Sequence, residues 1–367
     1  MPTTVPTRLR AAIVGCGTVA ANHAKAYRAA PGVDLVACCD PVPGKAAAFA
    51  ARHGIEHAVG DVETLLDLGA DVLSVCTPHP THEAVVLAAA ARGVHVLCEK
   101  PIAVDLFAGL RMVEACEAAG VTLGVVFQRR FWPAARRIRA AIDNGTVGVP
   151  VLGHASVLLH RDTGYYTADA WRGTWATDGG GVLMTQAIHH LDLLMWFMGE
   201  VVEVSARAAT FAHADAIEVE DTLVATLRMA GGGLATLSAS TALTPGLGAQ
   251  VRITGRTGAT VGLVEYPEGT EAVTDLWAVP GEVLVAPSYP AGILPDPPLP
   301  AINAALAPFH AALIDDFIQA VRTAGAPAVS GREALRSLAV VSALYASAAS
   351  GTPQPVADIR PREDRSR

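Results

Sequence analysis

Short apolar runs alternate with helical patterns along the first third of the chain. Helical patterns such as residues 81–91 and 104–119 fill the gaps between apolar runs at 10–14, 34–39, 71–76, 95–98 and 122–127. Strands that alternate with helices at this spacing predict βαβ units and a parallel, doubly wound sheet. We therefore expect an α/β domain over residues 8–128.

The pattern changes after Asn144, where extended runs dominate. A polar, aromatic loop is expected at 160–178 and a long helix at 181–198, among extended runs at 149–159, 201–209, 221–229 and 234–242. The last two runs flank Gly231 to Gly233, which is a hairpin signal. Successive strands predict an antiparallel sheet, and hence a second domain of α+β type over residues 129–355.

The last part of the chain returns to helical patterns. Several prolines predict an irregular loop at 290–300, followed by helices at 310–323 and 332–350. These closing helices are candidates to pack back on the N-terminal domain. The charged end, residues 356–367, is expected to be a frayed tail.

Composition narrows the function classes. The chain has 367 residues, enough for two domains, and its formal charge of −8 argues against nucleic acid as a partner. With neither a signal-peptide pattern nor an apolar run of membrane-spanning length, we expect a cytoplasmic protein without a membrane partner. The six cysteines have no zinc-site spacing, so we expect buried reduced thiols and no metal.

A glycine-rich motif follows the first apolar run directly. The first glycine permits a tight turn, the second lets the backbone approach a pyrophosphate, and the closing alanine allows close packing of the next helix. An aspartate ends the second apolar run 20 residues later, which strengthens the assignment. We expect dinucleotide binding by Gly15, Cys16, Gly17, Thr18, Val19 and Ala20.

Asp40 indicates which dinucleotide is bound. A carboxylate accepts hydrogen bonds from the adenosine ribose hydroxyls and repels a 2′-phosphate, and neither Pro41 nor Val42 supplies an arginine for that phosphate. NAD is therefore expected rather than NADP. The alternative is that Asp40 only caps the turn from Pro41 to Gly44.

Two further motifs carry candidate chemistry. Glu99-Lys100-Pro101 ends the apolar run at 95–98, where ligands bind in such sheets, although a solvated charged turn is an equal alternative. Three glycines at 179–181 open the long helix, on which Thr185, His189 and Asp192 are expected to share one stripe. His190 projects elsewhere and is expected to be structural, as is Asp192.

Together these motifs, with Thr77-Pro78, His82 and the closing helix from Gly331, resemble the Gfo/Idh/MocA family. The resemblance implies an N-terminal Rossmann domain and a C-terminal α/β domain with an open antiparallel sheet. In this family, one face of that sheet is commonly buried between subunits. A homodimer or homotetramer is therefore expected.

The resemblance also implies the catalytic residues. Lys100 matches the active-site lysine and His189 the general acid/base, while Thr185 stands where many members carry aspartate. The run Gln186 to His189 and the stretch Trp171 to Trp175 resemble the branch of sugar-nucleotide and glycoside 3-dehydrogenases. Cofactor contacts are further implied for Thr77, Pro78, His82, Glu99, Lys100 and Gln128.

The polar loop is expected to shape the substrate site. Aromatic faces suit sugar rings, and an arginine can bind a carboxylate or phosphate, although a structural role for Arg172 is equally plausible. The expected substrate contacts are Arg161, Tyr165, Tyr166, Trp171, Arg172, Gln186 and His189. The expected reaction is hydride transfer between NAD and a secondary hydroxyl carbon of a sugar, polyol, glycoside or sugar nucleotide. The alternatives are a redox-neutral enzyme that recycles tightly bound NAD, including one that cleaves glycosides, and a non-enzymatic dinucleotide-binding regulator.

Overall fold

The computed structural model describes residues 8–287 and 294–359, which fall into two compact units. Unit 1 combines the chain up to Gln128 with Leu306–Leu335, and unit 2 combines Arg129–Ala305 with the chain from Arg336 onward. Two helices, α9 (Leu299–Thr323) and α10 (Gly331–Ser350), therefore contribute residues to both units.

Unit 1 contains a six-stranded sheet in the order β3-β2-β1-β4-β5-β6, and every pairing in it is parallel. The expected doubly wound sheet is thus confirmed. Its strands are β1 (Leu9–Val14), β2 (Val33–Cys39), β3 (His57–Val59), β4 (Val72–Val75), β5 (His95–Cys98) and β6 (Leu123–Val125). The strand order reverses between β1 and β4, which is where such sheets bind ligands.

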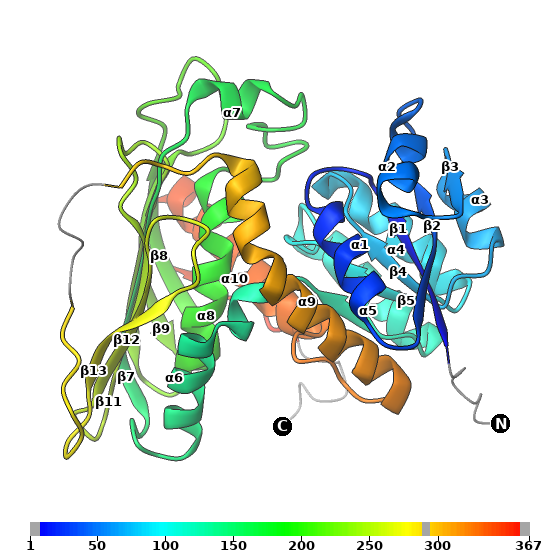
Figure 1. Ribbon diagram of the computed structural model, residues 1–367. Helices are drawn as coiled ribbons and strands as arrows, with labels where there is room; N and C mark the ends of the chain where they lie inside the picture. The colour runs from blue at the N-terminus through cyan, green and yellow to red at the C-terminus, as the bar shows by residue number, and fades with distance from the viewer. Residues whose placement is uncertain (1–7, 288–293, 360–367) are drawn as a thin grey trace. The chain divides into compact units, whose positions relative to one another are not determined.

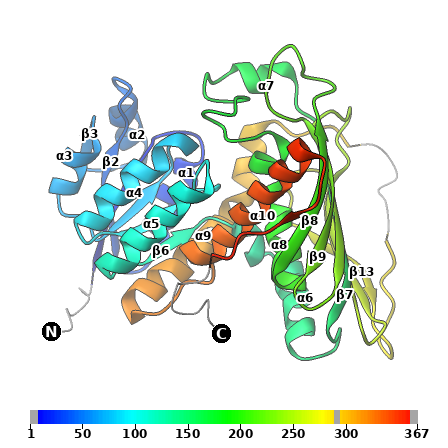
Figure 2. The same cartoon turned by 180° about the vertical axis from the view of Figure 1, so that it is seen from behind.

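Helices cover both faces of this sheet, which explains why its strands are apolar runs rather than alternating patterns. Figure 2 shows α4 and α5 side by side on one face, and Figure 1 shows α1 on the other. The helices between strands are α1 (Ala20–Ala29), α2 (Lys45–His53), α3 (Val62–Asp67), α4 (His82–Ala91) and α5 (Leu106–Ala119). Asp61 and Asp105 cap α3 and α5 by accepting hydrogen bonds from Thr64 N and Ala108 N.

Residues 294–298 are irregular and 310–323 are helical as expected, but the boundary predicted between this loop and this helix is wrong. α9 already begins at Leu299 and continues through Pro308, while residues 290–293 of the expected loop lie outside the described part of the chain. Pro300 lies in the first turn of α9, where its missing N–H would have no hydrogen-bond partner within the helix. Pro308 lies inside the helix and removes a backbone hydrogen bond, and burial of the apolar face of α9 offsets that loss. By length and composition α9 is also apolar enough to cross a membrane, contrary to the sequence estimate. Its buried residues Leu313, Phe317 and Ile318 make it a core helix.

Unit 2 contains an eight-stranded sheet in the order β13-β12-β11-β7-β10-β9-β8-β14. The predicted hairpin joins β9 to β10. The sheet is mixed rather than purely antiparallel, because β7 and β10 pair in parallel at its centre. Its strands are β7 (Pro150–Leu158), β8 (Val201–Ala209), β9 (Thr222–Met229), β10 (Leu234–Ser240), β11 (Gly248–Gly255), β12 (Thr260–Glu265), β13 (Val273–Ala278) and β14 (Gln354–Pro355).

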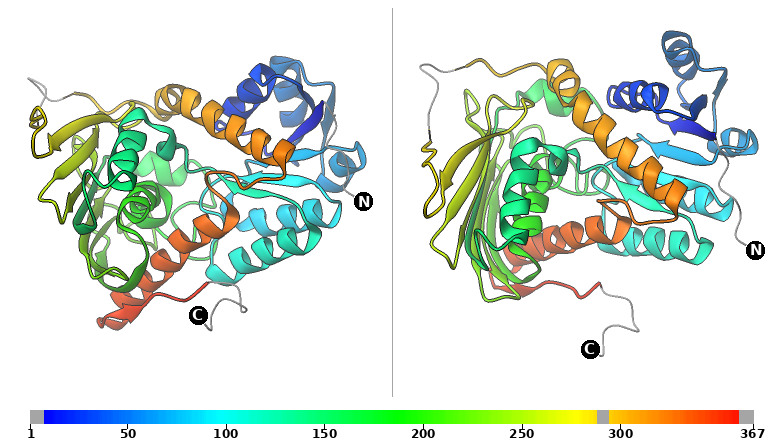
Figure 3. Two further views of the ribbon diagram at one scale, coloured as in Figure 1. Left: turned by 90° about the horizontal axis from the view of Figure 1, so that it is seen from below. Right: turned by 60° about the horizontal axis from the view of Figure 1, so that its bottom comes forward.

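Helices of unit 2 cover one face of this sheet. Figure 3 shows α6 (Pro133–Asp143) and α8 (Ile188–Met198) on that face, with the opposite face of the sheet bare. Leu152, Val224 and Leu234 point from the bare face and are exposed. The loop expected at 160–178 contains a short helix, α7 (Thr163–Thr167), and a π-helical turn, Leu183–Ala187, precedes α8.

Candidate functional site

The glycine turn after β1 has the geometry that a dinucleotide cradle needs. Gly15 has φ +89°, and a Cβ there would lie 2.6 Å from the carbonyl oxygen of Cys76. A Cβ on Gly17 would meet nothing within 4 Å, so the space above this residue is open. α1 begins at Ala20, and the side chain of its N-cap residue, Val19, makes no capping bond. The first N–H groups of α1 and its dipole thus suit a pyrophosphate.

Asp40 lies at the end of β2 and is almost fully buried. Its Oδ2 accepts a hydrogen bond from Cys16 N at 2.9 Å, and its Oδ1 accepts one from Val42 N at 3.0 Å. Burial acts to raise the pKa of Asp40, but these N–H groups and Lys45 lower it overall. Asp40 therefore caps the following turn and also ties that turn to the cradle.

Lys45 is a cation that the sequence reading overlooked. Its Nζ lies 3.0 Å from Asp40 Oδ2 and is partly exposed. Lys45 lies five residues after Asp40 in the sequence, as the first residue of α2, and is therefore not part of the segment directly after Asp40 that indicates cofactor preference. A lysine beside Asp40, the carboxylate expected to bind the ribose, weakens the repulsion that Asp40 exerts on a phosphate.

Two buried polar atoms lie at the carboxyl ends of unit 1 strands. Thr77 Oγ1 follows β4 and Gln128 Oε1 follows β6, and neither atom has a hydrogen-bond partner in the structure. Buried polar atoms are normally satisfied, so both atoms suit contact with a ligand. Together with the cradle, they make the residues present fit a bound dinucleotide.

His82 supports this region rather than opening toward it. Its ring nitrogens lie 3.0 Å from Thr77 O and 3.0 Å from Pro101 O, and burial lowers its pKa to about 4. The ring thus fixes the segments that carry Thr77 and Lys100. The Lys100–Pro101 peptide bond is cis.

Glu99 is the buried partner of Lys100 in the motif. Its Oε1 lies 3.0 Å from His23 Nε2 and 3.8 Å from His310 Nε2, and its Oε2 accepts from Lys100 N at 3.3 Å. Burial acts to raise its pKa, but the hydrogen bond and charge of His23 prevail and lower it to about 2. Glu99 is therefore an anion that holds the backbone of Lys100, and no sequence signal pointed to the two histidines.

His189 lies in the first turn of α8 and is 5% exposed. The expected common stripe with Thr185 and Asp192 is altered, because the π-helical turn holds more residues per turn than an α-helix. Asp192 faces Arg130 in a buried bidentate ion pair with two 2.7 Å contacts, which accounts for its structural role. Thr185 Oγ1 lies against two acceptors, Gly181 O at 2.8 Å and Gln186 Oε1, and its single hydrogen is donated to one of them at a time.

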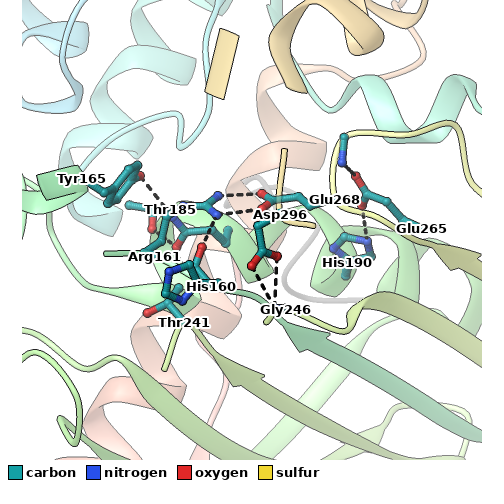
Figure 4. Close-up of polar contacts among 12 residues, drawn as sticks. His160, Arg161, Tyr165, Thr185, His190, Thr241, Gly246, Glu265, Glu268 and Asp296 are labelled. Atoms are coloured by element: carbon teal, nitrogen blue, oxygen red, sulfur yellow. Dashed lines mark hydrogen bonds and ion pairs between the residues drawn. The ribbon is translucent and has the colours of Figure 1, made fainter. Parts of the chain in front are cut away.

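Tyr165 organises the expected substrate residues of unit 2. Its hydroxyl accepts from Arg172 at 2.7 Å and from Gln186 Nε2 at 3.1 Å. The guanidinium carbons of Arg161 and Arg172 lie 5.1 and 4.5 Å from its ring centroid. Figure 4 shows Arg161 between Tyr165 and Glu268, to which it forms a bidentate ion pair at 2.6 and 2.7 Å. Arg161 is thus largely committed to Glu268.

The other two expected residues differ in their exposure. Tyr166 is buried, and its hydroxyl pairs with Thr241 Oγ1 at 2.9 Å, so it belongs to the core of this loop. Trp171 is half-buried, and its ring lies under the guanidinium of Arg172 at 4.4 Å. An aromatic face and a partly exposed guanidinium are therefore adjacent at Trp171 and Arg172.

A second buried ion pair lies under α8. Arg129 binds Glu265 through contacts of 3.0 and 3.1 Å, and both side chains are less than 8% exposed. His190 Nε2 lies 3.1 Å from the same carboxylate, as Figure 4 shows, and burial lowers the pKa of His190. These contacts confirm a structural place for His190. All six cysteines are buried and free, as expected.

Comparisons with known proteins define the class first. The model of an oxidoreductase family with an NAD-binding Rossmann fold matches residues 9–127, so unit 1 carries the dinucleotide-binding domain of an oxidoreductase. A model of the GFO/IDH/MocA C-terminal domain matches residues 135–261. The chain belongs to the Gfo/Idh/MocA oxidoreductase family, and the resemblance drawn from its motifs is confirmed.

Its relatives are dehydrogenases that act on sugar hydroxyls. The chain is 29% identical to D-apiose dehydrogenase of Paraburkholderia graminis over 355 residues, which cover 95% of this chain and 90% of that protein. It is 32% identical to D-glucoside 3-dehydrogenase of Escherichia coli over 64% of this chain and 71% of that one. The crystal structure of WlbA dehydrogenase from Bordetella pertussis with NADH and UDP-GlcNAcA is similar with a TM-score of 0.81. That similarity has 32% identity and covers 96% of this chain and 99% of the other.

Proposed function

We propose that the protein transfers hydride between NAD and a secondary hydroxyl carbon of a sugar, glycoside or sugar nucleotide. The observation that carries this proposal is that the chain has both the glycine cradle with Lys100 and the helix with His189. Unit 1 has an open glycine cradle and Lys100, whose backbone is held by the anionic Glu99, and unit 2 has the buried His189 in the first turn of α8. Dehydrogenase relatives with sugar-like substrates support the substrate class.

The chain's own residues supply the proton chemistry of this reaction. NAD, when bound, supplies the hydride acceptor. His189 takes the proton of the substrate hydroxyl, because imidazole exchanges protons near neutral pH. The ammonium of Lys100 hydrogen-bonds the substrate oxygen and stabilises the negative charge that develops there. Trp171 and Arg172 contact the sugar ring and its polar substituents.

Substitution of the two proton-handling residues tests the proposal. Lys100→Met and His189→Asn are each expected to lower turnover at least about a hundredfold, the range of general acid–base help, with NAD affinity nearly unchanged. Lys25→Met, on the exposed side of α1, and His57→Asn on β3 are matched controls with unchanged turnover. The substrate is found by screening monosaccharides, glycosides, inositols and nucleotide sugars with both cofactors. Near wild-type turnover by both active-site variants would show that the assignment is wrong.

The form of the signal separates the rival functions. A dehydrogenase accumulates free NADH, which is measured by absorbance at 340 nm. A redox-neutral enzyme converts the substrate while the NADH signal stays flat. A regulator binds the dinucleotide and converts none of the screened compounds.

A further inference from the structure

Glu220 is a buried carboxylate, 3% exposed, two residues before the start of β9. Its Oε2 accepts from Gly181 N at 2.9 Å, and its Oε1 accepts from Leu183 N at 2.9 Å and from the Tyr345 hydroxyl at 3.0 Å. Its main-chain oxygen accepts from Val182 N at 3.1 Å. One residue therefore binds three successive N–H groups at the start of the helical segment that leads to His189.

The glycines before this segment are required by Glu220 and Tyr345. A Cβ on Gly181 would lie 1.7 Å from Glu220 O, and a Cβ on Gly180 would lie 2.0 Å from the Tyr345 hydroxyl oxygen. Both distances are far shorter than van der Waals contact, so a side chain at either position would displace the main chain of Glu220 or the tyrosine. The glycine turn thus serves close approach inside unit 2.

We call Glu220, Tyr345 and the N–H groups of residues 181–183 the clamp. Hydrogen bonds connect the clamp to the side chains of Thr185, Gln186 and Tyr165. Gly181, which is bound by Glu220, accepts from Thr185 N at 3.0 Å and from Thr185 Oγ1 at 2.8 Å. Thr185 Oγ1 also contacts Gln186 Oε1, which competes with Gly181 O for the hydroxyl hydrogen, and Gln186 Nε2 donates to the Tyr165 hydroxyl. A displacement at Glu220 is therefore passed to Thr185, Gln186 and the first turn of α8.

We propose that Glu220, clamped with Tyr345, is a positioning residue for catalysis, and that its ionised carboxylate sets the placement of His189. This inference rests on the proposed function. An ionised carboxylate accepts all three donors, from Gly181, Leu183 and Tyr345. A protonated carboxyl turns one oxygen into a donor, which weakens the bond from Gly181 N or Leu183 N at that oxygen, because an N–H group cannot accept, whereas the Tyr345 hydroxyl can turn and accept.

The environment of Glu220 brings this ionisation into the neutral range. Burial raises its pKa to about 7, although the N–H groups of Leu183 and Gly181 and the Tyr345 hydroxyl act to lower it. The titratable group that faces it from α10 is Tyr345, whose own pKa is raised well above its usual range by burial. The adjacent Asp221 binds the N–H groups of residues 211–213 instead. Catalysis is therefore expected to require two deprotonated groups, His189 as the base and Glu220, whose ionisation lies near pH 7.

Stability follows the opposite sign. The folded pKa of Glu220 lies above its ordinary value of 4.5, so its contribution to stability is full below about pH 4.5 and is lost as pH rises through about 7. As pH rises through about 7, ionisation of Glu220 is therefore expected to raise turnover and to lower the free energy of unfolding. If Glu220 served stability alone, its ionisation would not raise turnover.

Glu220→Gln tests the clamp, because the amide mimics the protonated carboxyl at every pH. Turnover by this variant at pH 8 is expected to fall about tenfold to a hundredfold, the range for a misplaced catalytic group. In the wild type, log kcat/KM is expected to rise with pH below pH 7 with a slope of about two, because two groups must lose a proton. In Glu220→Gln the slope is expected to be about one, with NADH affinity unchanged. Glu218→Gln, the same change at an exposed position two residues away, is the matched control. Equal pH profiles for the two variants would overturn the proposal.

Two further measurements keep the test decisive. Hydrogen exchange of the peptide 179–190, corrected for intrinsic rates, is expected to be faster at pH 8 in Glu220→Gln than in Glu218→Gln or the wild type. This result needs no substrate, so it judges the clamp even if no sugar is oxidised and the proposed function fails. Should Glu220→Gln not fold, Tyr345→Phe removes one donor and is expected to move the wild-type limb to higher pH. An unmoved limb, or exchange equal in all folded variants, contradicts the clamp.

Discussion

The buried pair of Arg129 and Glu265 offers a direct test of how unit 2 is held together. We consider Arg129→Met, which keeps an unbranched side chain, shortens it and removes its charge. The change leaves Glu265, which is 1% exposed, with His190 and the N–H of Gly269 at 2.7 Å as its remaining partners. A buried carboxylate without its cation is costly, because its charge has lost both water and its counter-ion.

Buried ion pairs in general give the size of the cost, and the pKa of Glu265 gives its direction. Removal of one partner of a buried ion pair typically destabilises by about 3–5 kcal/mol. The pKa of Glu265 is lowered from 4.5 to about 2, because the charge of Arg129 and the hydrogen bond of His190 overcome the effect of burial. That shift corresponds to stability that is present above pH 4.5 and lost as pH falls through about 2. For a unit of this size, the melting temperature is expected to drop by roughly 6–20 °C.

Tryptophan fluorescence during urea unfolding measures this loss in unit 2. All five tryptophans, Trp132, Trp171, Trp175, Trp196 and Trp277, belong to unit 2, so the signal does not report on unit 1. The control is Arg228→Met, which breaks the exposed pair with Glu203 at 3.4 Å and is expected to cost about 0–1 kcal/mol.

The pH dependence provides the refutation. In Arg129→Met, the pKa of Glu265 is expected to rise, so the difference from wild type should shrink as pH falls from 8 toward 5. The double variant Arg129→Met with Glu265→Gln is expected to recover part of the loss, because no buried charge then remains. A double variant as unstable as the sum of the two single variants would show that the two side chains do not interact as the structure indicates.

The remaining predictions concern the cofactor, the helix and the sheet. NAD is expected to bind more tightly than NADP in calorimetric titrations. Asp40→Ala, which leaves Lys45 in place, is expected to reduce the difference in affinity between the two cofactors. Equal or tighter binding of NADP by the wild type refutes this prediction. Thr185→Val is expected to lower turnover by less than about tenfold, because an alcohol is a poor base, and a loss as large as that of a His189 variant would overturn that role. Light scattering at micromolar concentration is expected to give a dimer or tetramer that Leu234→Glu dissociates, because Leu234 is 58% exposed on the bare face of the sheet; a monomeric wild type contradicts this.

Much of unit 1 could be predicted because its signals are local. Five of its six strands are apolar runs that alternate with helices, so period and order suffice to define them, whereas the short, partly exposed edge strand β3 was not predicted. Gly15 was recognisable because its positive φ and close approach to Cys76 admit no side chain. The same locality placed Lys100 at the end of β5 and His189 on a helix.

Unit 2 was less predictable, because its strands pair across long stretches of chain. The parallel pairing of β7 with β10 joins segments about 80 residues apart, and no turn signal announces it. The strands β11, β12 and β13 were not anticipated, since they contain glycines and polar residues that are hidden only by the neighbouring strands.

The sequence by itself determined the cradle, the fold class and the residues that carry the proposed chemistry, because these depend on residue type and short-range spacing. Only the tertiary structure decided how those residues are held. Arg129 meets Glu265 across 136 positions and Tyr345 meets Glu220 across 125, and neither pairing has a spacing that a sequence displays. Such partners are selected by burial, since a charge in the core requires a counter-charge or donors wherever the fold brings them.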